Sequence, residues 1–307
     1  MPVVSAPGKM ILLGEHAVVF GKPAIAIGID MRMTCTVVEA GQNMVNGHPL
    51  DDRYHSYLAT AIKEYWVGEP LDITLESDIP SGSGLGSSAA LVVSLLGAMA
   101  VMRGGIDEEA IAKAAFDVES TVQGRASPLD TSTSAHGQGV FIDSVPGDQL
   151  LWHVEKDSRQ WYVHHCAVPD LTFVVGFTGI RAPTGPLVAK VKRFFDRTRF
   201  ARDIIDEIGT ITEDGAKCLQ NRDTVSLGEL MTRDHNLLTI LGVSSPELQR
   251  LVDASMPYSY GAKLTGAGGG GSMIALTDNP EKVAEVISRR GGIPYVVRTD
   301  VDGVREE

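Results

Sequence analysis

The sequence predicts an α+β protein with two domains. Segments with the two-residue period of a strand precede segments with helical spacing in the first half of the chain, and the C-terminal part repeats the order strand, helix, strand. With 307 residues, 43% of them apolar, the chain is long enough to bury two cores. Because a new strand and long helical patterns begin after about residue 160, we place the predicted domains at residues 1–165 and 166–307.

The first domain is expected to contain two strands and two helices in its central part. Apolar residues alternate from 25 to 37, and a second strand, 71–76, leads into a glycine-rich loop. Residues 89–102 are apolar on every side, which predicts a buried helix, and at about 14 residues the run is too short to span a bilayer. Residues 106–122 have helical spacing, with Asp107 as N-cap.

The second domain is expected to begin with a strand and two long helices, at 171–177, 185–209 and 211–241. Its C-terminal part predicts further elements on either side of a glycine run. These are strands at 263–265, 272–276 and 293–299 and a helix at 280–290, with the glycine run at 266–271.

Charge and cysteine content exclude several classes of function. The net charge of −12 and a pI near 5.1 argue against nucleic acid or an anionic membrane as the main partner. The three cysteines are widely scattered and form no Cys-x-x-Cys pair, which favours a reducing, cytoplasmic compartment and no structural zinc. Residues 1–5 lack the pattern of a signal peptide. Because the chain is acidic, an anionic substrate would have to be bound by local backbone amides, a lysine or a metal ion.

A glycine- and serine-rich loop at 80–89, directly before the apolar helix, predicts a phosphate cradle. Its glycines allow backbone N–H groups to turn towards an anion, and the helix starting at Ser87 or Ser88 adds unpaired amides and a positive dipole end. The spacing of Gly82, Gly84 and Gly86 fits neither a Walker A loop nor the dinucleotide fingerprint. A flexible linker or a tight strand-to-helix turn remains the alternative.

Two further segments favour phosphate chemistry. Residues 7–21 place Lys9, Glu15 and His16 around a short apolar strand. The glycine run at 266–271 is costly in backbone entropy, so a close approach to a ligand explains it better than a purely structural role.

Two carboxylates are candidates for catalysis. Glu119 lies on the apolar stripe of the helix at 106–122, where it is either a partner in a buried ion pair or hydrogen bond, or a magnesium ligand. Asp130 follows a loop with two helix breakers, where it is either an N-cap or a base that faces the substrate.

Together these segments resemble the GHMP kinases. Residues 80–89 match the family signature Pro-x-x-x-Gly-Leu-Gly-Ser-Ser-Ala, and residues 263–271 match its C-terminal glycine motif. Within this superfamily, residues 7–21 are most similar to the mevalonate kinases of the short archaeal type, since a galactokinase would carry arginine after Pro-Gly. The resemblance implies a two-domain α+β GHMP kinase fold, with an N-terminal domain like domain 2 of ribosomal protein S5 and a ferredoxin-like C-terminal domain.

The resemblance also implies an activity, the ATP-dependent phosphorylation of (R)-mevalonate at its C5 hydroxyl for isoprenoid biosynthesis, by a homodimer. Asp130 would accept or orient the hydroxyl proton with Lys9 beside it, and Ser88 and Glu119 would hold Mg²⁺. The residues implied at the ATP phosphates are Ser81, Gly82, Ser83, Gly84, Leu85, Gly86, Ser87 and Ser88. Those implied at mevalonate are Lys9, Glu15, His16, Asp130, Thr184, Gly268 and Gly269.

Two alternative functions stay open at this point. One is another GHMP kinase acting on a mevalonate phosphate or at a different hydroxyl, for which Arg125 and Arg181 are the candidate cations. The other is an inactive GHMP relative that senses a ligand. Two departures from the family pattern, the hydroxyl-rich segment 131–134 and Ser272 in place of the common cysteine, affect the neighbouring pocket and not the candidate catalytic atoms.

Overall fold

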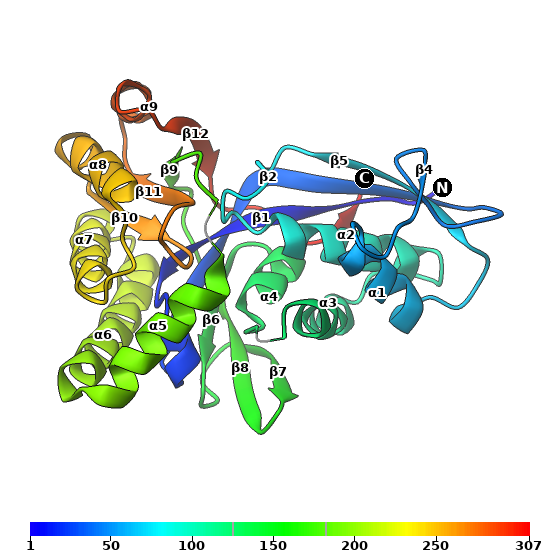
Figure 1. The fold of residues 1–307 in the computed structure, drawn as a ribbon, viewed down its shortest axis with the longest axis horizontal. Helices are drawn as coiled ribbons and strands as arrows, with labels where there is room; N and C mark the ends of the chain where they lie inside the picture. The colour runs from blue at the N-terminus through cyan, green and yellow to red at the C-terminus, as the bar shows by residue number, and fades with distance from the viewer. Residues whose placement is uncertain (125, 182) are drawn as a thin grey trace.

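Two β-sheets organise the chain, and each is covered by its own helices (Figure 1). The computed structural model describes residues 1–124, 126–181 and 183–307. Figure 1 shows the two groups of elements side by side, with the long strands β1 (Val3–Leu13) and β2 (Ala24–Glu39) reaching from the first group to the second. The two-domain α+β fold predicted from the sequence is therefore confirmed.

The first sheet has the order β4-β3-β5-β2-β6-β8-β7 in the described part of the chain, and β1 pairs with β2 and with β13. Its remaining strands are β3 (Met44–Val45), β4 (His48–Pro49), β5 (Leu71–Ser77), β6 (Gly139–Asp143), β7 (Leu150–Lys156), β8 (Arg159–Cys166) and β13 (Arg305–Glu306). The β1–β2 pairing shifts register between Pro7 and Gly8, immediately before Lys9.

Four helices lie along one side of β1 and β2 (Figure 1). They are α1 (Ser56–Tyr65), α2 (Ser87–Val101), α3 (Glu108–Gln123) and α4 (Leu129–His136). The α2 helix is buried along most of its length, as its apolar sequence predicts. The Asp107 side chain caps α3 by accepting a hydrogen bond from the Ala110 N–H at 3.0 Å, which confirms the predicted start of this helix.

The second sheet has the order β10-β11-β9-β12. Its strands are β9 (Thr172–Phe177), β10 (Gly261–Thr265), β11 (Ser272–Leu276) and β12 (Ile293–Arg298), and its helices are α5 (Thr184–Arg197), α6 (Arg199–Asn221), α7 (Thr224–Ile240), α8 (Pro246–Ser255) and α9 (Pro280–Arg289). The short 3-10 helices η1 (Ala17–Phe20) and η2 (Met256–Tyr258) follow β1 and α8. None of the helices in the described ranges has the length and apolar character needed to cross a membrane.

The prediction of two long helices at 185–209 and 211–241 is wrong, because the region forms three helices. The breaks fall at Thr198 and Asp223, whose side chains cap α6 and α7 by accepting from the N–H groups of Ala201 and Ser226. Gly209 lies inside α6, where a Cβ would come within 3.3 Å of the Lys22 side chain. Its small size therefore serves packing, and the chain continues as a helix through it.

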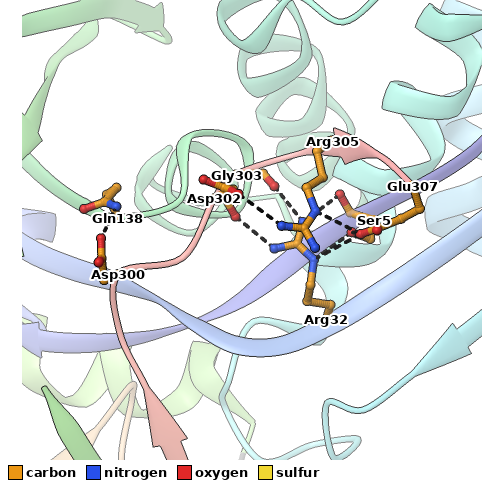
Figure 2. Close-up of polar contacts among 8 residues, drawn as sticks. All are labelled: Ser5, Arg32, Gln138, Asp300, Asp302, Gly303, Arg305 and Glu307. Atoms are coloured by element: carbon orange, nitrogen blue, oxygen red, sulfur yellow. Dashed lines mark hydrogen bonds and ion pairs between the residues drawn. The ribbon is translucent and has the colours of Figure 1, made fainter. Parts of the chain in front are cut away.

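The segment 299–307 returns from the second sheet to the first. It forms β13, which pairs antiparallel with β1, and the Val304 N–H donates to the carbonyl of Ala135 at the end of α4. Figure 2 shows how Arg32 on β2 fixes this segment. The Arg32 guanidinium donates to the carbonyls of Asp302 and Gly303 at 2.9 and 2.7 Å and to the hydroxyl of Ser5 on β1. The domain boundary at residues 165 and 166 stays a prediction.

Candidate active site

A cleft of about 1870 Å³ is lined by both groups of elements. The phosphate loop 80–86 and the starts of α2 and α4 line it from the first domain, and the glycine turn 266–271 and the start of α5 line it from the second. Most of the candidate residues meet here. They are Lys9, Glu15, His16, Ser81, Gly82, Gly84, Gly86, Ser87, Ser88, Glu119, Asp130, Thr184 and Gly268.

The alternating glycines of the phosphate loop have a steric cause. Gly82, Gly84 and Gly86 all have left-handed φ angles, of 74°, 83° and 79°. At Gly86, which precedes α2, a Cβ would lie 2.7 Å from Cγ of Lys9. The loop therefore closes directly over Lys9, and its last glycine leads into the first turn of a buried helix, where Ser87 and Ser88 line the cleft and no side chain caps the first amides.

Lys9 and Asp130 form an ion pair at the base of this loop. The Lys9 Nζ lies 2.9 Å from Oδ2 of Asp130, and the two side chains are 4% and 30% exposed. The backbone N–H of Lys9 donates to the carbonyl of Leu85 at 2.9 Å, and its Nζ approaches the carbonyl of Gly84 at 3.4 Å. Lys9 is thus fixed from the loop side, while the first turn of α4 presents the Asp130 carboxylate to the cleft.

Glu119 on α3 is buried beside this pair and is incompletely satisfied. Its Oε1 accepts a hydrogen bond from Nε2 of Gln123 at 3.1 Å, whereas its Oε2 has no partner among the described residues. Burial and then the charge of Asp130 raise the pKa of Glu119 to about 8, and Lys9 opposes this. A buried carboxylate oxygen without a partner is suited to a hard cation such as Mg²⁺, and Ser88, the other candidate ligand, lines the same cleft.

Tyr57 and Gln123 are cleft residues that the sequence analysis missed. The Gln123 amide donates to the Tyr57 hydroxyl at 2.7 Å as well as to Glu119. Gln123 follows Glu119 by four residues on the same helix, so helical spacing was an available signal. Tyr57 comes from α1, far away in the sequence, and no local pattern indicates its position.

Glu15 and His16 lie where β1 meets the second domain. The Glu15 carboxylate forms an ion pair with Lys263 on β10, and Lys263 Nζ lies 3.2 Å from Oδ2 of Asp234 on α7. His16 bonds the carbonyl of Ala267 through Nε2 at 2.9 Å, and its buried Nδ1 has no partner among the described residues. Burial lowers the pKa of His16, so its ring is neutral. The sequence analysis gave Lys263 and Asp234 no role.

The glycine turn lines the same cleft as the phosphate loop and the start of α5. A Cβ on Gly268, whose φ is 82°, would lie 2.1 Å from the carbonyl of Val243. Gly268 lines the cleft, while Gly269 is turned away and its N–H donates to the same Val243 carbonyl at 2.7 Å. The Ser272 hydroxyl donates to the carbonyl of Ser83 at 2.7 Å and so ties the turn to the phosphate loop.

Three other candidates lie behind or beside the cleft. Ser83 is fully buried and donates from its hydroxyl to the carbonyl of Pro80, and the Leu85 side chain belongs to the apolar core. Arg181 lies beside the loop, with Nη2 3.2 Å from the Ser81 hydroxyl. Arg125 lies outside the described residues.

Family models match both domains. The model of the GHMP kinases N terminal domain matches residues 53–138, which include the phosphate loop, Glu119 and Asp130. The model of the GHMP kinases C terminal matches residues 216–292, which include the glycine turn. The fold and the site therefore define a kinase of the GHMP class.

Individual relatives narrow this class. The chain is 40% identical to a mevalonate kinase from Methanothermobacter thermautotrophicus over 88% of each chain, and 33% identical to one from Pyrococcus horikoshii over 99% of this chain and 97% of that one. The crystal structure of the Methanococcus jannaschii mevalonate kinase has a TM-score of 0.80 and 26% identity, covering 97% of this chain and 98% of that one. The chain belongs to the mevalonate kinase family, which confirms the resemblance seen in the sequence.

Proposed function

We propose that this protein transfers the γ-phosphoryl group of ATP to the C5 hydroxyl of (R)-mevalonate, giving 5-phosphomevalonate and ADP. The observation that carries this proposal is the ion pair of Lys9 and Asp130 beneath a glycine-rich loop that opens into the cleft. The choice of mevalonate is supported by relatives that are named mevalonate kinases and match nearly the whole chain.

Asp130 and Lys9 would perform the proton and charge chemistry. As the C5 oxygen attacks the γ-phosphorus, its proton passes to the Asp130 carboxylate, and the bond from the γ-phosphorus to the bridging oxygen of ADP breaks. Lys9 pairs with Asp130 and stabilises the negative charge that develops on the attacking oxygen and on the transferred group. Because Lys9 is almost completely buried, its charge acts in a medium that screens it less than water does.

The phosphate loop would bind the ATP phosphates through its backbone. Gly82, Gly84 and Gly86 line the cleft without side chains, and the free amides at the start of α2 add the positive end of the helix dipole. This arrangement allows a protein with a net charge of −12 to bind a polyanion.

We assign the magnesium ion that accompanies ATP to Ser88 and Glu119. The unpartnered Oε2 of Glu119 supports this assignment, since a bound cation would satisfy it. When bound, the ion neutralises charge on the phosphate oxygens. Gln123, held against the Tyr57 hydroxyl, occupies the other Glu119 oxygen and leaves Oε2 free for the metal.

On the substrate side, we assign His16, Thr184 and Gly268 to mevalonate, because each lines the cleft. Glu15 also reaches the cleft wall, but its carboxylate is engaged by Lys263, so its effect on mevalonate would pass through that pair. Gly269 would act by shaping the turn, since its N–H is bound to Val243.

The test is a coupled assay of ADP release with Mg-ATP. We expect turnover with (R)-mevalonate and little with 5-phosphomevalonate, homoserine or galactose. Turnover of 5-phosphomevalonate but not of mevalonate would refute the proposal in favour of a kinase for a phosphorylated substrate, for which Arg181 beside Ser81 is a candidate cation. Absence of ADP release with every substrate, despite ATP binding, would favour the inactive ligand sensor.

We further propose a cytoplasmic homodimer. The free thiols of Cys35, Cys166 and Cys218 support a reducing compartment, and the dimer follows from family membership alone. Sedimentation equilibrium tests the dimer, because a mass near the 32.8 kDa of one chain would contradict it.

A further inference from the structure

A buried cluster of three charged side chains joins the two domains behind the cleft. Glu15 follows β1 of the first domain, whereas Asp234 on α7 and Lys263 on β10 belong to the second. The three side chains are 1%, 0% and 0% exposed. Lys263 Nζ contacts both carboxylates, so the Glu15 and Asp234 carboxyl groups lie around one ammonium group.

The charges in this cluster do not balance if every group is ionised. Two carboxylates face one ammonium group, which would leave one negative charge without water to solvate it. The other titratable groups at the cluster are His16 and His235, and burial lowers the pKa of both, so neither supplies a compensating charge. Oε2 of Glu15 and Oδ1 of Asp234 accept no hydrogen bond from the described residues, and the Lys263 ammonium group, 3.2 Å away, is the charged contact of Oδ2 of Asp234.

We propose that Glu15, Asp234 and Lys263 share one proton and form an electrically neutral latch, which positions His16 and the glycine turn at the cleft. One carboxyl group carries the proton, and the other is ionised and paired with Lys263. Asp234 and Lys263 are therefore positioning residues. Burial raises the pKa of Glu15 to about 8 and also raises that of Asp234, in agreement with a proton retained at neutral pH.

The latch lies directly before the elements that it would position. Lys263 is two residues from Thr265, whose hydroxyl accepts from the N–H of Ile11 at 3.0 Å and donates to its carbonyl at 2.9 Å. The glycine turn follows at once, and His16, the neighbour of Glu15, is bonded to Ala267 within that turn. A shift of the latch would therefore move both walls of the cleft at the place assigned to mevalonate.

The first test follows proton release on unfolding and needs no substrate. An unfolded carboxyl group titrates near pH 4, so between about pH 5 and 8 the folded protein holds one proton that the unfolded chain gives up. The stability due to this proton is complete below about pH 4.5 and is lost as the pH rises towards 8. In Asp234→Asn, Glu15 pairs with Lys263 and no extra proton is needed. The ratio of the wild-type unfolding equilibrium constant to that of Asp234→Asn should therefore rise about tenfold per pH unit.

Urea denaturation at pH 5 to 9 measures this ratio. Glu229→Gln, an exposed change on the same helix, is the control and should follow the wild type at every pH. Glu15→Gln should behave like Asp234→Asn and keeps the test valid if the latter fails to fold. If the unfolding equilibrium constants of the wild type and both latch variants depend on pH in the same way, the proposal of a shared proton is refuted.

The second test concerns positioning and rests on the proposed kinase function. Above about pH 8 the wild-type latch loses its proton and gains a buried negative charge, so the KM for mevalonate should rise several-fold, whereas Asp234→Asn should show no such rise. The KM for ATP should change equally in both proteins. An identical rise in the KM for mevalonate in the wild type and in Asp234→Asn would refute the positioning role. Absence of all turnover would instead refute the kinase proposal, and the result of the urea experiment would still hold.

Discussion

The Lys9 and Asp130 side chains are 2.9 Å apart but differ greatly in their access to solvent. Lys9 is enclosed by β1, the phosphate loop and α4, so its charge is fixed in place, while Asp130 keeps one side open to the cleft. This asymmetry suits a base that must meet an incoming hydroxyl and a cation that must not move.

Replacing Asp130 with asparagine should therefore remove the proton acceptor and preserve the shape of the site. We expect kcat to fall by about 10²- to 10⁴-fold, with the affinity for ATP within a factor of about three, because the phosphate loop is untouched. Steady-state kinetics and nucleotide titration measure the two quantities. Asp143→Asn, a change at another carboxylate lining the cleft, is the control. A kcat near that of the wild type would remove Asp130 from its assigned role.

For single residues, the sequence predicts burial where it follows from the periodicity of one helix or strand. Glu119 falls on the apolar stripe of one helix, and its predicted burial is confirmed, because 3.6-residue periodicity decides which face it occupies. The partners of Glu15 were not predicted. Asp234 and Lys263 reach it from elements more than 200 residues away in the chain, and only the packing of the two domains brings them together.

At the scale of elements, the phosphate loop offers two glycines with the same backbone conformation and different surroundings. Gly84 and Gly86 have φ angles of 83° and 79°, but a Cβ at Gly84 meets nothing within 4 Å, whereas one at Gly86 meets the Lys9 side chain at 2.7 Å. The loop sequence predicts the turn, but the spatial neighbour that distinguishes the two glycines lies on β1 and is visible only in the fold.

Alanine at these two positions should have different kinetic effects. Both variants should lose about 1 to 2 kcal/mol of stability from the left-handed backbone. Gly86→Ala should also displace Lys9 and lower kcat at least tenfold, while Gly84→Ala should act mainly on the KM for ATP, because its methyl group enters the space assigned to the phosphates. Urea denaturation and steady-state kinetics test this, and equal kcat values for the two variants would contradict the role given to Lys9.

The returning segment 299–307 is an element that the sequence analysis did not predict. Its strand β13 has only two residues, too few to show a period, and its main anchor, Arg32, lies on β2, far away in the sequence (Figure 2). The Arg32 side chain is 14% exposed and donates hydrogen bonds to the carbonyls of residues 302 and 303 and to Ser5. The Arg305 side chain is 46% exposed and forms ion pairs with Asp302 and Glu307.

These two arginines should therefore differ in their contribution to stability. Arg32→Met leaves partly buried carbonyls without donors and should lower the free energy of unfolding by about 3 kcal/mol. Arg305→Met removes only exposed ion pairs and should cost less than about 1 kcal/mol. Chemical denaturation at neutral pH provides both values. Equal losses would mean that the segment is held by its surface charges, and no loss in either would mean that β13 pairing alone holds it.

At the scale of the whole molecule, the two domains share apolar core as well as the latch. One continuous cluster of buried residues includes Met10 and Ile27 of the first sheet together with Met231, Ile274 and Val297 of the second domain. Two sheets with helices were predictable, because each element carries its own periodicity. The joint core was not, since it depends on β1 and β2 extending into the second group of elements.

Because of this joint core, we expect both domains to unfold in a single cooperative transition. The two signals report differently on the domains, since Trp66, Trp152 and Trp161 are the three tryptophans of the chain and all precede residue 166, whereas helices lie in both domains, α1 to α4 in the first and α5 to α9 in the second. Tryptophan fluorescence and far-ultraviolet circular dichroism should therefore give coincident urea curves, with a calorimetric enthalpy equal to the van't Hoff enthalpy. Lys263→Met, which leaves the buried carboxylates of the latch without their cation, should shift the two curves together to lower urea. A fluorescence transition that separates from the dichroism in the wild type would show instead that the domains are stable independently and that the core and latch only dock them.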